Sequence, residues 1–180
     1  MRKVFGSKVL VEQVALSSKS GEGVLKIPQN ILGFSTIENA NTLKGFKKII
    51  ETKVPLKKLD EYDFGDVGFI KIDVEGHEED VLQGSEILLR KYHPNLLVEC
   101  EERHKKNTVE KISKFLKELG YDGYFFIHSK LSSINEFDKE KLQNFQDFQN
   151  IRNDVKQGIY INNFIFLTKE NLEKVSIFLK

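Results

Sequence analysis

The chain has 180 residues, which is enough for one domain with a substantial core, and we expect residues 1–180 to form a single unit. Its 28 Lys and Arg residues against 27 Asp and Glu residues give a net charge of +1, so no overall positive field draws the protein to nucleic acid or anionic membranes, and we expect neither as a partner. A single cysteine, Cys100, excludes an internal disulfide, and without an apolar run near ~20 residues or a cleavable leader we expect a cytoplasmic protein with no membrane span.

The first part of the chain is predicted to form three short strands. Residues 8–16 (KVLVEQVAL) mix alternation with β-branched residues, a Gly/Ser-rich turn follows, and VLKI resumes the extended pattern. Residues 29–48 contain turn-forming residues without a sustained period, which predicts a surface loop. The next strand, IETKVPL, contains Pro55, which favours an edge position because proline has no backbone N–H.

From residue 67 the pattern predicts a strand, a helix and a second strand. VGFIKIDV is apolar enough for a buried strand, and NLLVEC is a second such run. Between them, four residues share one helical face: Val81, Ser85, Leu88 and Tyr92. Pro94 ends this helix. Nearly continuous apolar strands are typical of a parallel sheet covered by helices on both faces, so we expect a βαβ unit.

The remaining elements continue an α/β pattern. A helix is predicted from Asn107, as its N-cap, to Gly120, with Glu110 in its first turn, and the strand YDGYFFI follows. Residues 128–158 form a polar insertion or cap, with apolar residues near helical spacing at its core: Phe137, Leu142, Phe145, Phe148 and Ile151. The strand YINNFIFLTK and an amphipathic helix close the chain.

The candidate chemistry lies where the two apolar strands end. In an open parallel sheet, ligands bind outside the carboxyl ends of the strands. Asp73 ends the first strand and Glu99 the second, so neighbouring strands would bring them together with Glu75 and Glu101. A carboxylate at such a position is open to tuning of its pKa, which favours a functional role for Asp73. For Glu75 and His77 a functional and a structural role are equally supported.

Several nearby residues have simpler structural interpretations. Glu78, Glu79 and Asp80 fall in a first helical turn, where the helix dipole favours carboxylates. Gly76 is interpreted as a tight turn and Gly84 as a close-packing site. Lys71 is either directed towards a covered edge, which we favour, or paired with a carboxylate. The remaining histidines are interpreted as ordinary surface or loop residues: His93, His104 and His128.

A metal site is a weaker alternative. The pattern Asp73-x-Glu75-x-His77 offers oxygen and nitrogen ligands, which Glu99 or Glu101 would complete, and the same group is consistent with a metal-dependent hydrolase. This spacing is not diagnostic of a metal, so the metal candidates remain Asp73, Glu99 and Glu101. The chain has no glycine-rich phosphate loop, zinc-type cysteine pair or nucleophile elbow.

Three segments resemble the FkbM-type family of S-adenosylmethionine-dependent methyltransferases: VPLKKLDEY, FIKIDVEGHEEDVLQGSEILL and PNLLVECEE. Members of that family show a similar Leu-Asp, then Lys-Ile-Asp-Val-Glu-Gly-His-Glu, then a helix containing a glycine. The upstream VEQVALSSKSGEG is similar to the family's third strand and the turn after it. The resemblance extends over roughly residues 8–127, and it has no counterpart for the polar insertion.

The resemblance implies a Rossmann-like methyltransferase sheet, mostly parallel with an antiparallel last strand, that binds S-adenosylmethionine. It implies methyl transfer to an oxygen or similar nucleophile of a small or glycan-like acceptor. Ala15 and Leu16 match the turn beside the adenine of the donor. Asp73 matches the position beside the methionine part of the donor and the acceptor, and Glu75 and His77 adjoin it. His77 or Asp73 would then be the base that activates the acceptor.

The resemblance also implies an N-terminally truncated domain. The family's first two strands, with the glycine-rich donor loop, precede the position of Lys8, where this sequence has seven residues. A fragment or misassigned start, a partner chain that supplies the missing half, or a non-catalytic binding remnant would each explain this, and we favour the first. We therefore expect the chain alone to bind S-adenosylmethionine poorly.

Overall fold

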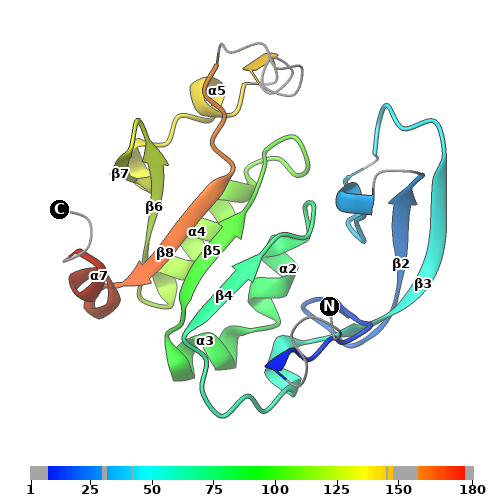
Figure 1. Cartoon of the computed structure of the whole chain (residues 1–180), viewed down its shortest axis with the longest axis horizontal. Helices are drawn as coiled ribbons and strands as arrows, with labels where there is room; N and C mark the ends of the chain where they lie inside the picture. Colours follow the sequence, from blue (N-terminus) through cyan, green and yellow to red (C-terminus); the bar gives the residue numbers. More distant parts are fainter. Residues whose placement is uncertain (1–7, 30–31, 42, 145, 148–157, 177–180) are drawn as a thin grey trace.

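The protein is described here by a computed structural model, which covers residues 8–29, 32–41, 43–144, 146–147 and 158–176. Its strands form two sheets, one of three strands and one of five, and helices pack against the larger sheet (Figure 1). The fold is therefore mixed α/β, as the sequence predicts, with the strands divided between two sheets.

The small sheet contains the three predicted N-terminal strands in the order β1, β3, β2. Their bounds are Ala15–Leu16 for β1, Gly21–Pro28 for β2 and Ile49–Lys57 for β3. β1 is much shorter than the predicted strand over 8–16. β3 is central, parallel to β1 and antiparallel to β2, so the predicted edge position of Pro55 is wrong. The proline is tolerated because β1 pairs only with Leu56 and Lys57, leaving Pro55 without a partner in β1.

The predicted surface loop over residues 29–48 is only partly exposed. It contains a 3-10 turn, η2, over Leu32–Phe34, and Thr36 forms an isolated bridge with Lys26 of β2. Thr36 is 1% exposed, and Asn41 is also buried. This segment therefore buries polar side chains, which a plain surface loop would not do.

The large sheet has the order β4, β5, β8, β6, β7. The bounds are Phe69–Ile72 for β4, Asn95–Glu99 for β5, Tyr121–Ile127 for β6, Lys130–Ser133 for β7 and Asn163–Thr168 for β8. β4 and β5 are parallel, as expected of a βαβ unit. β8 inserts antiparallel between β5 and β6, which agrees with the predicted antiparallel last strand.

The prediction of a mostly parallel sheet is wrong, because three of the four ladders in the large sheet are antiparallel. β8 accounts for two of them, and β7 pairs with β6 in a hairpin. The turn residues of that hairpin, His128 and Ser129, have φ angles of 48° and 62°, the conformation of a type I′ turn. His128-Ser129 differs from the Asn-Gly sequence that usually marks such a turn, so the hairpin was not predicted from the sequence.

The predicted first helix is divided into α2, over Glu78–Gln83, and α3, over Glu86–Tyr92. Asp60, in the 3-10 turn η3 over Leu59–Glu61, separates them. Its carboxylate accepts hydrogen bonds from the backbone N–H groups of Ile87, at 3.1 Å, and Leu88, at 2.9 Å. Its own N–H donates to the Gly84 carbonyl at 3.0 Å. A side chain distant in sequence therefore starts the second helix.

The second predicted helix is α4, over Thr108–Glu118, but its N-terminal cap differs from the prediction. The Asn107 side chain makes no capping hydrogen bond. Instead the Glu102 carboxylate accepts from the N–H groups of Asn107, at 2.6 Å, and Val109, at 3.3 Å. Gly120, with φ of 86°, follows the helix as expected of a C-terminal glycine.

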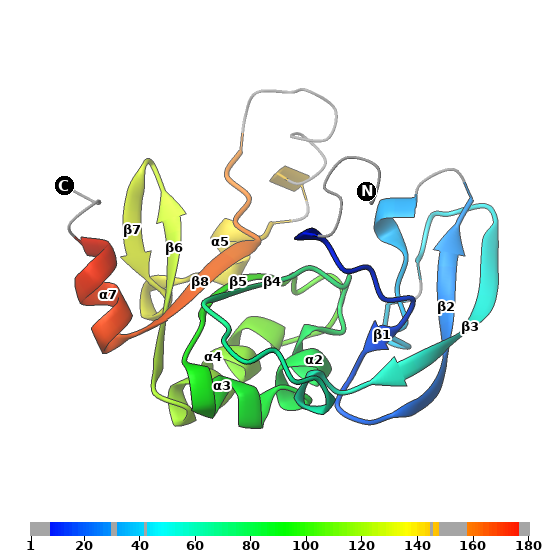
Figure 2. The same cartoon turned by 60° about the horizontal axis from the view of Figure 1, so that its bottom comes forward.

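The helices α2, α3 and α4 lie on one face of the large sheet (Figure 2). The strand residues that face them form the core, for example Leu96 and Val98 of β5, which are 0% exposed. Leu97, which points to the opposite face, is only half-buried. The prediction of helices covering both faces is therefore wrong for the described residues, and β5 alternates in burial although its sequence is continuously apolar.

The polar insertion over 128–158 is described only in part. Its described elements are β7, the 3-10 turn η4 over Ile134–Glu136 and the short helix α5 over Lys139–Leu142. Phe137 packs on Phe125 and Phe164, with ring centroids 5.7 and 5.0 Å apart, so it belongs to the core. Phe145, Phe148 and Ile151, predicted to share its helical spacing, lie outside the described residues.

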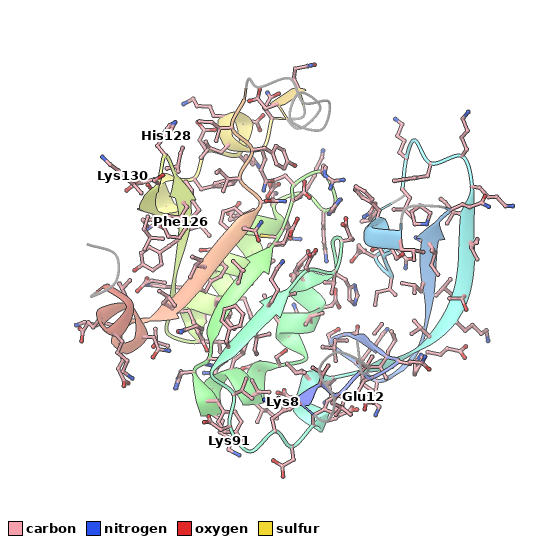
Figure 3. All side chains as sticks on the ribbon, viewed as in Figure 1. Lys8, Glu12, Lys91, Phe126, His128 and Lys130 are labelled. Atoms are coloured by element: carbon pink, nitrogen blue, oxygen red, sulfur yellow. The ribbon has the colours of Figure 1, made fainter. Side chains whose placement is uncertain are left out.

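The chain closes with α7, over Lys169–Ser176, as the predicted C-terminal helix. At the far side of the sheet, the hairpin of β6 and β7 carries Phe126, His128 and Lys130 (Figure 3). A bilayer span was not found among the described helices, since none combines the necessary length with sufficient apolar character.

Candidate functional site

Residues 73–77, here called the acidic turn, join the carboxyl end of β4 to α2. Glu75 and Gly76 have positive φ angles of 52° and 105°. A Cβ on Gly76 would lie 3.0 Å from the Cβ of His104, so glycine is favoured both by conformation and by space. This agrees with the predicted role of Gly76 in a tight strand-to-helix turn. A positive φ at Glu75, which is not a glycine, needs support from its surroundings.

That support comes from the segment between β2 and β3. The Thr36 hydroxyl and the Asn41 side-chain amide both donate to the Glu75 carbonyl oxygen, each at 2.9 Å. Two buried donors on one carbonyl fix the orientation of the peptide after Glu75. Neither donor was identified from the sequence, because both lie in a segment without periodicity and more than thirty residues from Glu75.

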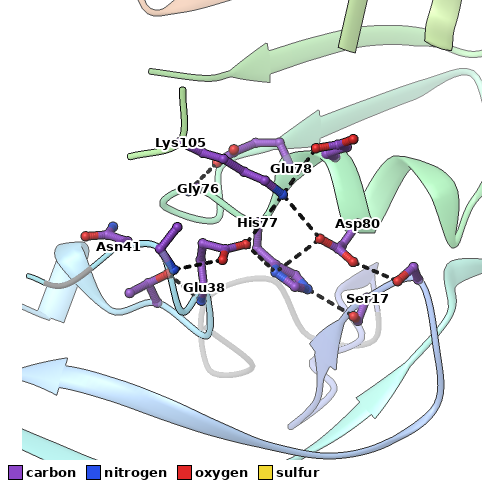
Figure 4. Close-up of polar contacts among 12 residues, drawn as sticks. Ser17, Glu38, Asn41, Gly76, His77, Glu78, Asp80 and Lys105 are labelled. Carbon is purple, nitrogen blue, oxygen red and sulfur yellow. Dashed lines mark hydrogen bonds and ion pairs between the residues drawn. The ribbon is translucent and has the colours of Figure 1, made fainter. Parts of the chain in front are cut away.

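Glu78 folds back onto the acidic turn from the start of α2. Its Oε1 accepts a hydrogen bond from the Gly76 N–H at 2.8 Å (Figure 4). Its side chain is 1% exposed, and burial raises its pKa to about 7, although the N–H groups of Gly76, Glu78 and Val74 oppose this shift. Glu78 is therefore more than a carboxylate favoured by the helix dipole, because it holds the turn.

His77 is held from both sides of its ring. Its Nε2 lies 2.9 Å from the Ser17 hydroxyl, and its Nδ1 lies 3.4 Å from Glu38 Oε2 and 3.7 Å from Asp80 Oδ2 (Figure 4). Hydroxyl, imidazole and carboxylate stand in the order of a nucleophilic triad. Ser17 is 3% exposed, however, so its hydroxyl does not face a substrate. We interpret these contacts as a junction between the turn after β1 and the start of α2.

The carboxylates around His77 lie beside the positively charged side chain of Lys105. One ligating atom each of Glu38, His77 and Asp80 lie within 4.8 Å of one another, a spacing compatible with a metal ion. The Lys105 ammonium lies 3.7 Å from Glu38 Oε2, 3.7 Å from Asp80 Oδ2 and 3.1 Å from Glu79 Oε2. Because the ammonium group of this lysine already lies beside Glu38 and Asp80, we do not assign a metal there.

Asp73 lies at the open face of the sheet and shares a lysine with Glu99. Lys71 Nζ is 3.4 Å from Asp73 Oδ2 and 3.3 Å from Glu99 Oε2. The side chains of Lys71 and Asp73 are 37% and 48% exposed. Lys71 therefore pairs with carboxylates, which is the alternative that the sequence interpretation had favoured less. Glu99 also accepts from the Asn162 side chain at 2.6 Å.

Glu101 is neutralised by an arginine. Arg103 donates to its two oxygens at 2.6 and 2.7 Å, and the Tyr160 hydroxyl donates to Oε2. Although burial alone raises the pKa of Glu101, Arg103 and Tyr160 hold it below the usual value. The candidate metal ligands Asp73, Glu99 and Glu101 are therefore all paired with basic side chains.

Glu75 and His104 approach each other below the acidic turn. Glu75 Oε2 lies 3.2 Å from His104 Nε2, and the two side chains are 15% and 6% exposed. Burial raises the pKa of Glu75 to about 7 and lowers the pKa of His104 to about 4. Together with Asp73, Glu78, Glu99 and Glu101, these two residues line one small cavity. His104 was predicted to be an ordinary loop histidine, and its position three residues after Glu101 was the available signal.

Ala15 and Leu16 adjoin the acidic turn through the residue that follows them. They form β1 and pair with Leu56 and Lys57, and the next residue, Ser17, contacts His77. The predicted donor-side and acceptor-side residues are thus brought to neighbouring positions, although they are more than fifty residues apart in the chain.

A larger cavity lies elsewhere, between α4 and the segment from β7 to α5, with a volume of about 800 Å³. Its lining mixes lysines with carboxylates and contains none of the predicted site residues. We place the candidate site at the acidic turn instead, because the buried titratable groups and the carboxyl ends of parallel strands meet there.

Most of the chain is similar to proteins of one known family. Residues 4–122 match a family model described as a methyltransferase FkbM domain. A solved structure of methyltransferase FkbM from Methylobacillus flagellatus KT is similar at 13% sequence identity with a TM-score of 0.49, and the similarity covers 90% of this chain and 29% of that chain. A comparison with curated proteins found no significant match.

Proposed function

Because this chain belongs to the FkbM family of methyltransferases, we propose that it transfers the methyl group of S-adenosylmethionine to a hydroxyl oxygen of a small or glycan-like acceptor. The observation that carries this proposal is the position of the acidic turn. This turn follows β4 directly and lies at the end of the large sheet where the parallel strands β4 and β5 have their carboxyl ends. It belongs to the part of the chain that matches the methyltransferase domain. The large sheet would then be part of a Rossmann-like methyltransferase sheet, and the predicted cytoplasmic location stays a prediction.

On the donor side, we propose that Ala15 and Leu16 lie beside the adenine and Asp73 beside the methionine part. Half-buried apolar side chains at β1 suit a flat aromatic base, and the Ser17–His77 contact of 2.9 Å ties that strand to the acidic turn. The nearly half-exposed Asp73 carboxylate suits a cationic group such as the donor's ammonium.

On the acceptor side, we propose Glu75 as the base that takes the hydroxyl proton. A base works best when its pKa lies near the operating pH, and burial raises the pKa of Glu75 to about 7. Asp73 would orient the acceptor for in-line attack on the methyl group. His77 has both ring nitrogens engaged by Ser17 and Glu38, so in this proposal it positions the turn and does not accept the proton.

Transfer of a radiolabelled methyl group tests this function. The full chain is incubated with labelled S-adenosylmethionine at high concentration and with monosaccharides, disaccharides and small hydroxylated compounds. We expect Glu75→Gln to lower the transfer rate by about 10²- to 10⁴-fold, the usual contribution of a general base. His128→Asn, at the distant hairpin, serves as the matched control and should leave the rate unchanged.

Two outcomes decide against the proposal. Equal transfer rates for the wild type, Glu75→Gln and Asp73→Asn would show that the acidic turn takes no part in methyl transfer. Absence of transfer to every acceptor, with folding intact, would favour the alternative of a non-catalytic binding module. A metal-dependent hydrolase using Asp73, Glu75, His77 and Glu99 is less favoured, because Lys71 pairs with Asp73 and Glu99, and His77 is engaged on both sides.

A further inference from the structure

We propose that Glu75 and His104 form one proton-holding pair, in which a single hydrogen always lies between Glu75 Oε2 and His104 Nε2. His104 would then be a positioning residue for Glu75, whereas the sequence analysis interpreted it as an ordinary loop histidine. The use of this pair in catalysis rests on the proposed function, whereas the pair itself is a property of the folded chain.

The contact distance carries the first step. The two atoms are 3.2 Å apart, and neither is hydrogen-bonded to any other group of the described residues. If the carboxylate were ionised while Nε2 had no hydrogen, two lone pairs would face each other in a buried place, which is costly. A hydrogen on one of the two atoms turns the same approach into a hydrogen bond.

The second step concerns which atom holds that hydrogen. Burial lowers the pKa of His104 to about 4, so the imidazole is neutral at neutral pH and has one N–H. Burial raises the pKa of Glu75 to about 7. Above pH 7 the carboxylate is charged, and Nε2–H donates to it. Below pH 7 Glu75 takes one proton from solvent, its O–H donates to Nε2, and the imidazole hydrogen moves to Nδ1.

Charged groups from several elements surround the pair. Arg103 lowers the pKa of both groups, while Asp73 and Glu101 raise both. Glu99 raises the pKa of Glu75 as well, and Glu78, from α2, lines the same cavity. The surrounding charges therefore act in opposite directions, and burial is the leading cause of both shifts.

The consequence for the proposed reaction is geometric. His104 restrains Glu75 through Oε2 and leaves Oε1 to meet the acceptor hydroxyl. When Glu75 accepts the acceptor proton, the pair gains one proton and no charge is placed on the imidazole. His104 thus keeps the base oriented in both of its protonation states.

Nitrogen-15 NMR of the histidine side chains tests the pair directly. The uniformly labelled full chain is titrated from pH 5 to 9, and the His104 signals are assigned from His104→Gln or, if that variant does not fold, from proton contacts with Gly76, which packs against His104. We expect His104 to stay neutral but to change from the Nε2–H to the Nδ1–H tautomer as the pH falls through about 7. In Glu75→Gln the tautomer should be independent of pH. The exposed His93 and His128 are internal controls.

The results separate the pair from the function. A His104 ring that becomes doubly protonated between pH 5 and 9, or one whose tautomer does not change over this range, overturns the pair. A stoichiometric shift of the His104 signals with Mn²⁺ or Zn²⁺ also overturns it, because the two atoms would then be metal ligands. If the tautomer changes as expected and no methyl transfer is found, the pair stands and only the proposed function fails.

Discussion

Glu78 shows how a buried carboxylate can support a turn at a cost to stability. One oxygen accepts from the Gly76 N–H, while Oε2 has no hydrogen bond within the described residues. Burial raises its pKa from the ordinary glutamate value of 4.5 to about 7. The folded state therefore binds more protons than the unfolded state between these two values, so stability falls as the pH rises from about 4.5 to about 7.

Glu78→Gln is expected to remove this pH dependence. The amide oxygen can still accept from the Gly76 N–H, and no charge is buried at high pH. We expect the free energy of unfolding at pH 8 to rise by about 1–3 kcal/mol, from 1.36 kcal/mol per pKa unit, with a smaller gain at pH 5. Urea denaturation at both pH values measures it, with the exposed Glu118→Gln as control. An equal change at pH 5 and pH 8 would contradict the assignment of the raised pKa to Glu78.

His77 is expected to matter more for folding than for proton transfer. His77→Ala leaves the buried Ser17 hydroxyl and the Glu38 carboxylate without their contacts to the ring. We therefore expect a loss of about 1–3 kcal/mol in the free energy of unfolding, the usual cost of unsatisfied buried polar groups. Urea denaturation measures this loss beside His128→Asn. An unchanged stability, together with loss of methyl transfer, would instead support His77 as the base.

The site residues that could be predicted from the sequence are those that lie close together in the chain. Asp73, Glu75 and His77 follow one strand within five residues, so a strand prediction alone places them at a sheet edge. Thr36, Asn41 and His104 come from other segments, and only the tertiary fold brings them to the acidic turn. A polar side chain in an aperiodic segment gives no sign of the carbonyl that it will bind.

At the scale of elements, Gly84, at the end of α2, packs closely against the turn after β1. A Cβ at Gly84 would lie 2.0 Å from the Ser17 carbonyl oxygen and 2.9 Å from its carbonyl carbon. These are backbone atoms, which cannot move aside as a side-chain end would. The sequence prediction that Gly84 is a close-packing site is thereby confirmed. The helix break itself was missed, because the capping Asp60 lies in a separate turn.

Gly84→Ala is accordingly expected to separate the turn after β1 from α2. The overlap with backbone atoms puts the cost at the upper end of overpacking, about 3 kcal/mol or more. Thermal and urea denaturation measure it. Gly33→Ala is the matched control, because a Cβ there meets nothing within 4 Å, and it should change stability by less than about 0.5 kcal/mol. Similar stabilities for the two variants would contradict the close contact.

The predicted strands were mostly correct, whereas their pairing was not. Period and composition identified β5, β6 and β8, because apolar and β-branched runs are local signals. The order of strands and their directions depend on contacts between distant segments, and β8 enters between β5 and β6 after a long insertion. The prediction of a mostly parallel sheet was wrong because the composition of an apolar strand does not indicate whether its neighbours run parallel or antiparallel to it.

At the scale of the whole molecule, β4 is the edge strand of the large sheet in the described part of the chain. It pairs with β5 alone, and Phe69 at its start is 58% exposed. Nearby, Phe64 is 46% exposed. An edge with exposed aromatic residues invites pairing with another strand, and within the described residues no strand pairs with the free side of β4.

We therefore expect weak binding of S-adenosylmethionine by this chain. The proposed donor contacts come from Ala15, Leu16 and Asp73, and three such contacts leave most of the donor's polar groups to solvent. Calorimetric titration should give a dissociation constant weaker than about 100 μM, which corresponds to less than about 5.5 kcal/mol of binding free energy. Adenosine serves as the control ligand. Asp73→Asn should weaken the binding of S-adenosylmethionine and leave the binding of adenosine unchanged. A dissociation constant in the low micromolar range, unchanged by Asp73→Asn, would show that the donor is held by other residues, because the contacts proposed here cannot supply that affinity.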